Sequence, residues 1–358
     1  MSEENKPLLL AVSEAPHIRA KDSITSIMWT VVIALMPAAG YSIYLFGLNA
    51  LVVLLASIAA AVATEAAVQR ALKRPVTALD GSAALTGLLV GMNIPPEAPL
   101  WVGVIGSIFA IVIVKQLFGG LGFNIFNPAL AARAFLMASW PVHMTTRWHA
   151  FSGSNVLAEG VRNVTAIPKE AFDAITSATP LSLLKAAPIL SEEYNCAIQK
   201  IQGLLVSPDM LKSLFVGNVG GVIGETSALL LLIGGIILLA RRIITWHVPV
   251  AFIGTVGVLM YAYYALTGHT QAHFFSLFHV LSGGLFLGAF FMATDVVTSP
   301  VTGKGLLLFG FGCGLITCVI RIWGGYPEGV SYSILIMNAL VPLIDRFIKP
   351  KVFGVGKK

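Results

Sequence analysis

Apolar windows of about 20 residues recur along nearly the whole of this 358-residue chain, separated by short stretches rich in Gly, Pro or basic residues. A helix of about 20 residues is long enough to cross the hydrocarbon core of a bilayer. Hydrophobic residues make up 56% of the chain and charged residues only 11%, which is too little charge for the surface of a soluble domain. The sequence therefore predicts an all-α polytopic membrane protein.

About ten transmembrane helices are predicted from apolar runs near the required length, with some shorter exceptions. They cover residues 24–46, 48–70, 78–93, 99–118, 126–139, 225–240, 247–267, 273–293, 305–322 and 331–348. Basic residues flank these spans on one side of the predicted membrane: Arg19, Lys21, Arg70, Lys73, Arg74, Arg241, Arg242, Lys304 and Lys349. Because basic loops remain in the cytoplasm, we expect a cell inner-membrane protein with both termini cytoplasmic. The acidic start, Met-Ser-Glu-Glu, does not resemble a secretory signal.

One segment, residues 140–224, is too polar to span and far longer than an ordinary loop. The charge pattern places it outside the cytoplasm, and loops of this length are usually functional. The predicted organisation is a first transmembrane repeat over residues 1–139 with a short cytoplasmic N-terminus, an extracytoplasmic loop over 140–224, and a second repeat over 225–358.

Two parts of the chain share the same order of features. Residues 80–87, Asp-Gly-Ser-Ala-Ala-Leu-Thr-Gly, lead through a Pro turn to Lys115, and residues 281–288, Leu-Ser-Gly-Gly-Leu-Phe-Leu-Gly, lead through a second Pro turn to Arg321. Each copy then has an apolar helix that is expected to open near an Asn, at Asn127 and Asn338. The predicted topology makes the two five-helix repeats inverted, as in transporters whose broken helices meet at the midplane. Shared Gly-rich composition is the alternative explanation.

Lys115 and Arg321 occupy matching positions near opposite membrane faces. Long basic side chains at such positions usually extend to the interface, and this is the role we expect for both.

Three motifs carry a family resemblance. Residues 173–182 read Asp-Ala-Ile-Thr-Ser-Ala-Thr-Pro-Leu-Ser, residues 292–305 begin Met-Ala-Thr-Asp and contain Thr-Ser-Pro, and residues 123–133 read Phe-Asn-Ile-Phe-Asn-Pro-Ala-Leu-Ala-Ala-Arg. Together they resemble the family shared by the D subunit of the Rnf ion-translocating ferredoxin:NAD oxidoreductase complex and the B subunit of sodium-translocating NADH:quinone reductase. The short N-terminus fits the Rnf protein better.

The resemblance implies that a flavin transferase attaches FMN to Thr179 through a phosphodiester. Asp173, Thr176, Ser177 and Ala178 would form the rest of the attachment motif, with Ser177 standing where the signature usually has Gly. A threonine that precedes Pro in a Ser- and Ala-rich stretch is expected to be extended, exposed and accessible to an enzyme. The covalent flavin would carry the redox chemistry, with the protein positioning it.

Asp295 lies among hydroxyl residues at the predicted inner end of a span. Together with Thr298 it has the oxygen ligands for Na⁺ or for a proton relay, and Asp80 is a further carboxylate for such a pathway. A solvated helix-end carboxylate is the alternative for Asp295. Asn127 and Arg133 mark a short helix that the resemblance associates with a second flavin, held without a covalent bond, such as riboflavin.

The chain is not expected to work alone. It contains no Gly-x-Gly-x-x-Gly motif for NAD and no Cys cluster for an iron–sulfur centre, so partner subunits would supply both. Its basic residues follow the ends of apolar runs and predict topology rather than nucleic-acid binding, and no metal site or catalytic residue is predicted. The predicted function is electron transfer between ferredoxin and NAD coupled to Na⁺ or H⁺ transport. The alternatives are a cofactor-free channel or transporter for a small polar solute and a membrane scaffold.

Overall fold

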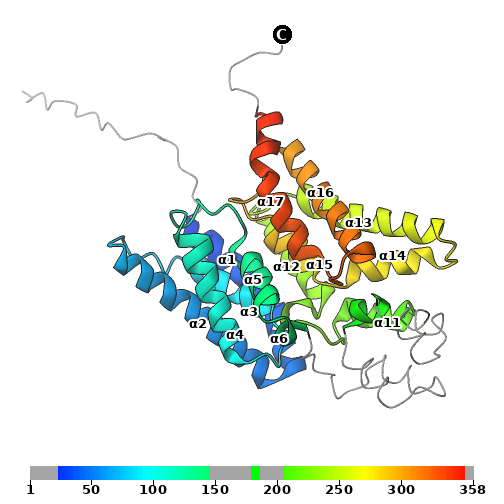
Figure 1. The fold of residues 1–358 in the computed structure, drawn as a ribbon, viewed down its shortest axis with the longest axis horizontal. Helices are drawn as coiled ribbons and strands as arrows, with labels where there is room; N and C mark the ends of the chain where they lie inside the picture. The colour runs from blue at the N-terminus through cyan, green and yellow to red at the C-terminus, as the bar shows by residue number, and fades with distance from the viewer. Residues whose placement is uncertain (1–22, 146–178, 186–202, 204, 351–358) are drawn as a thin grey trace, which may run out of the picture.

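The computed structural model describes residues 23–145, 179–185, 203 and 205–350, and all regular structure within these ranges is helical. The first half contains α1 (Ile24–Phe46), α2 (Leu48–Ala71), α3 (Ser82–Met92), α4 (Leu100–Phe109) continued by the π-helix η1 (Ala110–Gln116), α5 (Pro128–Ser139) and α6 (Pro141–Thr145). These helices form one group, and the helices of the second half form another beside it (Figure 1).

The second half begins with α11 (Pro208–Val216) and the short 3₁₀-helix η2 (Ile223–Glu225). It continues with α12 (Ala228–Ala240), α13 (His247–Leu266), α14 (Ala272–Leu281), α15 (Leu285–Leu287) running into the π-helix η3 (Gly288–Met292), α16 (Gly303–Trp323) and α17 (Val330–Phe347). A helical stretch over residues 180–185 carries the predicted attachment site at its start.

The predicted apolar segments all form helices, but their lengths differ. In the described residues α1, α2, α13, α16 and α17 are long and apolar enough to cross a membrane, and α14 with α15 and η3 forms a pair bent by 58°. The helices α3, α4 with η1, α5 and α12 are shorter apolar helices. The prediction of an all-α polytopic membrane protein is confirmed, and the number of crossings stays a prediction.

The bend between α14 and α15 follows from two consecutive glycines. Gly283 and Gly284 have φ values of 71° and 65°, in the left-handed region that favours glycine. A Cβ on Gly284 would lie 2.6 Å from Glu225 Oε1, so a carboxylate of η2 comes close to the start of α15. In the first half Gly81, with φ 89°, precedes α3 at the equivalent position. Both half-length helices therefore begin at a left-handed glycine.

The two asparagines of the repeats play different parts. Asn127 caps α5 as expected, because its side-chain oxygen accepts from the backbone N–H groups of Ala129 and Leu130 at 3.1 and 3.2 Å. The expectation that α17 opens near Asn338 is wrong, because α17 begins after the left-handed Gly329 and Asn338 lies within the helix. With its amide nitrogen donating to Thr298 O, Asn338 accepts from the Asn127 backbone N–H at 3.1 Å.

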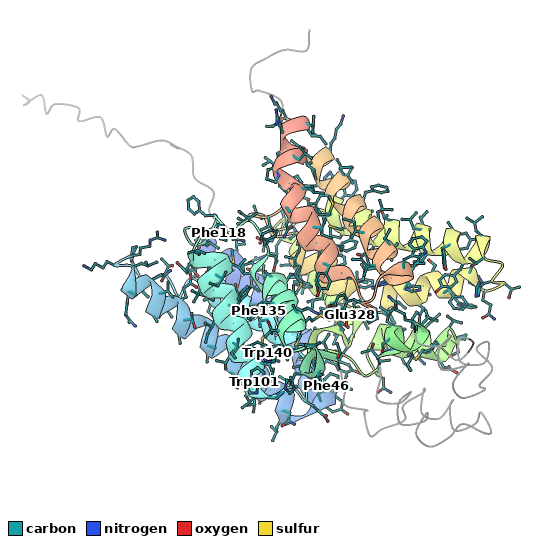
Figure 2. The ribbon with its side chains drawn as sticks, viewed as in Figure 1. Phe46, Trp101, Phe118, Phe135, Trp140 and Glu328 are labelled. Carbon is teal, nitrogen blue, oxygen red and sulfur yellow. The ribbon has the colours of Figure 1, made fainter. Side chains whose placement is uncertain are left out.

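Aromatic residues mark the ends of the first-half helices. Trp101 and Trp140 lie together with ring centroids 5.1 Å apart, and Phe118 lies at the opposite end of the α4–η1 helix (Figure 2). Tryptophan is enriched where membrane meets water. The end with Trp101 and Trp140 is the one that the charge pattern predicts to be outside the cytoplasm.

Candidate functional site

Thr179 begins the helical stretch over residues 180–185. Its hydroxyl donates to Ser182 Oγ at 2.9 Å and accepts from the Ser182 backbone N–H at 3.3 Å, which is the geometry of a helix cap. Lys185 fixes the other end of the stretch, since its Nζ donates to the carbonyl oxygens of Ile320 at 3.2 Å and Tyr326 at 3.1 Å, and also to that of Gly324. The attachment segment is thus tied to the end of α16.

Thr179 is only 6% exposed, so the expectation of an exposed threonine is wrong for this structure. The cause is the apolar side of the same stretch. Leu181, Leu183 and Leu184 are buried in a cluster with α11 and α14 residues, including Phe278, and they hold the stretch against the helices. Asp173, Thr176, Ser177 and Ala178 lie outside the described residues.

Thr179 lines a cavity of about 180 Å³, here called the outer cavity. Aromatic, thioether, hydroxyl and charged side chains surround it: Arg133, Met137, Met144, Thr145, Thr179, Ser182, Tyr326, Glu328, Ser331 and Tyr332. The Tyr326 and Tyr332 rings are stacked, with centroids 5.0 Å apart and planes at 25°. The outer cavity therefore combines a flat aromatic wall with a guanidinium and the threonine hydroxyl.

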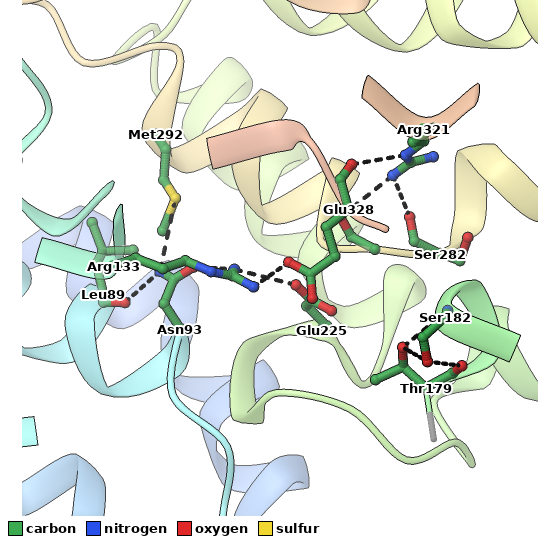
Figure 3. Close-up of polar contacts among 11 residues, drawn as sticks. Leu89, Asn93, Arg133, Thr179, Ser182, Glu225, Ser282, Met292, Arg321 and Glu328 are labelled. Carbon is green, nitrogen blue, oxygen red and sulfur yellow. Dashed lines mark hydrogen bonds and ion pairs between the residues drawn. The ribbon is translucent and has the colours of Figure 1, made fainter. Parts of the chain in front are cut away.

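Arg133 connects the two halves of the molecule at this cavity. It is 6% exposed, and its guanidinium donates to Asn93 Oδ1 at 2.8 Å within the first half. In the second half it pairs with Glu225 Oε1 at 3.4 Å and with Glu328 (Figure 3). Burying a charge is unfavourable unless it is paired, and here one buried guanidinium serves two largely covered carboxylates.

A second cavity of about 140 Å³, here called the inner cavity, is lined by Lys115, Asn124, Asn127, Phe290, Phe291 and Asp295 among others. Lys115 lies in η1 and the two phenylalanines lie in η3. Both π-helices of the described chain therefore border this cavity, and π-helical turns are frequent at functional sites.

Lys115 does not extend to the interface as expected, since only 2% of it is exposed. Its Nζ lies 2.8 Å from Glu65 Oε1 and donates to Ser82 Oγ at 2.7 Å. The Ser82 hydroxyl in turn donates to Asp80 Oδ1 at 2.6 Å. The expectation was wrong because the local sequence does not show that Glu65, a carboxylate from another helix, lies beside Lys115 and compensates its buried charge.

Asp295 lies in the turn after η3 and borders the inner cavity. Its carboxylate accepts from the Val297 backbone N–H and from Thr298 Oγ1, both at 3.3 Å. Although part of the residue remains accessible, packing around the carboxyl group raises the pKa of Asp295 above its ordinary value. The predicted partners Asp295 and Thr298 are therefore in contact, while Asp80 reaches the cavity only through Ser82.

The predicted second-flavin residues do not share one site. Asn127 lines the inner cavity and Arg133 the outer one. Glu328 was missed altogether, because a glutamate in a Gly- and Pro-containing turn gives no local signal that an arginine from a distant helix will pair with it.

Comparison with known proteins places the chain in a family. The family described as NQR2, RnfD, RnfE matches residues 11–354. The chain belongs to this family. The D subunit of the Na⁺-translocating ferredoxin:NAD⁺ oxidoreductase complex of Acetobacterium woodii is 48% identical over 352 residues, covering 98% of this chain and 97% of that protein. The resemblance based on the three motifs is confirmed.

Two further relatives belong to complexes named for other or unspecified ions. The D subunit of the proton-translocating ferredoxin:NAD⁺ oxidoreductase complex of Clostridium ljungdahlii is 46% identical over 352 residues, covering 98% of both chains. The D subunit of an ion-translocating oxidoreductase complex of Stutzerimonas stutzeri is 44% identical over 340 residues, with 93% of both chains covered.

The cavities also show how the halves of this family member are related. The start of α3 and the end of η1 contact each other at the inner cavity through Ser82 and Lys115. In the second half the equivalent contact joins Arg321, near the end of α16, to the carbonyl of Ser282 at 3.0 Å, beside the attachment segment. The same ends of equivalent helices thus lie at opposite cavities, as inversion requires. These contacts agree with the predicted inverted repeat, which stays a prediction.

The two half-length helices approach each other at their C-terminal ends. Asn93, after α3, has its amide nitrogen 3.9 Å from the sulfur of Met292, the last residue of η3, and the Asn127 amide donates to Met292 O at 3.2 Å. Broken helices that meet between two cavities are the arrangement expected for an inverted-repeat transporter.

Proposed function

We propose that this chain is the D subunit of an ion-translocating ferredoxin:NAD oxidoreductase complex and carries FMN on Thr179. The relatives that are named as D subunits align with it over nearly its whole length. The other subunits would supply the NAD and iron–sulfur chemistry that the sequence lacks. The charge pattern supports an inner-membrane location with cytoplasmic termini.

The observation that carries the flavin proposal is the position of Thr179 at the outer cavity. When bound, FMN supplies one- and two-electron redox chemistry. The stacked Tyr326 and Tyr332 rings offer an aromatic surface for a flat ring system, and the Arg133 guanidinium offers charge-assisted hydrogen bonds to its polar edge or phosphate. The residues present therefore fit the group.

The burial of Thr179 has a consequence for its partner enzyme. A flavin transferase needs the hydroxyl in the open, whereas residues 180–185 are packed against α11 and α14 in the folded chain. The transfer would therefore take place before this stretch packs, or after it is released.

The test is mass analysis of the tryptic peptide over residues 170–185, made in cells that contain the native flavin transferase. We expect one FMN phosphodiester, less water, on Thr179, and none in the Thr179→Ala variant. Ser182→Ala removes a hydroxyl from the same peptide and should keep the flavin. Flavin remaining on Thr176 or Ser177 in the Thr179→Ala variant would overturn the site but not the function.

The inner cavity suits a second flavin held without a covalent bond. Asn124 and Asn127 present amides at its edge, and Phe290 and Phe291 line it from η3. Because the Asn127 amide already caps α5 and donates to Met292 O, and the Asn124 amide donates to Phe126 O, a flat ring would be held here mainly by packing against the phenylalanines. This part of the proposal includes Asn127 and not Arg133.

The ion pathway is proposed to include Asp295, Thr298 and Asp80. A carboxylate in apolar surroundings is unfavourable unless a cation, a proton or a basic partner compensates it, and Asp295 has hydroxyl and N–H partners but no ion pair in the described residues. Asp295→Asn should keep the covalent flavin and the assembled complex while lowering ion uptake into vesicles during electron transfer. Asp295→Glu should retain part of the uptake. Normal uptake by an assembled Asn variant would place the pathway elsewhere.

A further inference from the structure

A third, much smaller cavity lies beside the attachment segment, between η2, the start of α15 and the turn before α17. Its volume is about 20 Å³, enough for one water-sized species. Its polar lining comes from Thr179, Glu225, Ser282 and Glu328, and Gly220, Gly221 and Gly283 contribute backbone. We call it the small cavity.

The polar side chains that line the small cavity have little access to water. The side chains of Glu225 and Glu328 are 7% and 14% exposed. Ser282 is 3% exposed, and its hydroxyl oxygen is buried with no hydrogen-bond partner in the described part of the chain. A buried hydroxyl without a partner is uncommon and calls for a ligand or an ordered water. Oxygen atoms of carboxylates and hydroxyls are the ligands that hard cations prefer.

The basic groups around the small cavity leave the carboxylates only partly compensated. Arg133 of α5 is the one basic side chain paired with Glu225 and Glu328 in the described residues. Arg321 of α16 is close enough to influence both, but its hydrogen bonds go to carbonyl oxygens, those of Glu328 at 2.9 Å and Ser282 at 3.0 Å among them. Tyr332 of α17 is a further titratable group close to Glu328. Two carboxylates thus share one guanidinium.

We propose that the small cavity binds one monovalent cation, a proton or Na⁺, between Glu225, Glu328 and Ser282. The cation would complete the charge of the cluster and provide a partner for the Ser282 hydroxyl. Gly284 allows this arrangement, because any larger residue would displace the Glu225 carboxylate that approaches it. The inference concerns the cation alone and does not depend on a flavin at Thr179.

Electrostatics agree with the geometry. Burial and the neighbouring Glu328 carboxylate raise the pKa of Glu225 to about 8, with Arg133 opposing the shift. Glu225 would then hold a proton at neutral pH unless another cation replaced it.

The experiment is infrared difference spectroscopy of the full chain in lipid nanodiscs, following the C=O band of protonated carboxyl groups. A pH titration in choline buffer tests the proton, and addition of NaCl against choline chloride at constant pH tests Na⁺. We expect a component that titrates near pH 8 and is lost in Glu225→Gln. Loss of this component on adding NaCl alone would identify Na⁺ as a competing occupant, and insensitivity to NaCl would identify the proton.

Two controls separate this site from other carboxyl groups. Asp295→Asn removes the contribution of the buried carboxyl at the inner cavity, and Glu97→Gln alters an exposed carboxyl and should change nothing. Glu328→Gln should shift or remove the titrating component because it removes the second carboxylate that lines the small cavity. If Glu225→Gln fails to fold, Glu225→Asp keeps a carboxyl and should move the midpoint. Spectra of folded Glu225 and Glu328 variants that match the unmodified protein would overturn the proposal.

Discussion

Lys115 and Arg321 occupy equivalent positions in the two repeats, yet their charges are compensated in different ways. Lys115 pairs with Glu65 at 2.8 Å, so its charge is balanced within the first half. Arg321 is 5% exposed and bonds to backbone carbonyls at the start of α15 and in the turn before α17. The carboxylates nearest to it, Glu225 and Glu328, pair instead with Arg133 of the first half.

The inner cluster, Lys115 with Glu65, is therefore closed within one repeat, whereas the outer cluster, Arg133 with Glu225 and Glu328, is shared between both. A closed pair fixes the helices of one half to each other. A shared cluster responds when the halves move relative to each other, because Arg133 and its two carboxylates come from different halves. An inverted-repeat protein that changes shape would therefore change the outer cluster more than the inner one.

The largest expected effect tests the inner pair. Lys115→Met should leave Glu65 buried without a charge partner, and breaking such a pair costs about 3–5 kcal/mol. Arg321→Met removes donors from carbonyls and should cost less, about 1–3 kcal/mol. Thermal unfolding in nanodiscs measures both.

The matched control for this comparison is the double variant Lys115→Met with Glu65→Leu. It removes both charges and should recover most of the lost stability, because a buried pair can often be replaced by apolar side chains. An Arg321→Met variant less stable than Lys115→Met would show that the carbonyl contacts of Arg321 stabilise the fold more than the ion pair of Lys115 does.

A smaller effect is expected from the equivalent glycines. Gly81→Ala and Gly284→Ala both place a side chain in the left-handed region, at a cost of about 1–2 kcal/mol. At Gly284 the new Cβ would also lie 2.6 Å from Glu225 Oε1, whereas at Gly81 its nearest neighbour is Trp29 Nε1 at 3.1 Å. Gly284→Ala should therefore be the more harmful by about 1 kcal/mol or more, through overpacking. Equal losses would mean that the Glu225 carboxylate moves aside freely.

The sequence predicted those features that depend on local pattern. The apolar runs predicted the helices, and the Asn-Pro pair predicted the cap of α5. It failed where the partner of a residue comes from elsewhere in the chain. Lys115 was expected at the interface because its partner Glu65 is 50 residues away, and the local sequence does not show that the two meet. Thr179 was expected to be exposed because the local sequence does not show that its segment packs against α11 and α14.

The smallest expected effect is the pH dependence of stability at the outer cluster. Because the pKa of Glu225 is raised to about 8, the folded chain keeps a proton that the unfolded chain releases above its ordinary pKa of 4.5. The stabilisation is therefore complete below the unfolded pKa and is lost as the pH rises through about 8. Between pH 7.5 and 8.5 the expected loss is about 0.7 kcal/mol.

Asp295 acts in the same direction, because burial raises its pKa as well. The comparison is therefore made in Asp295→Asn protein with and without Glu225→Gln, following the thermal midpoint across that pH interval in choline buffer. The variant that retains Glu225 should lose stability as the pH rises, and the Glu225→Gln protein should show a flatter profile. Parallel profiles would show that Glu225 does not hold the proton and that the outer cluster does not exchange protons in this pH interval.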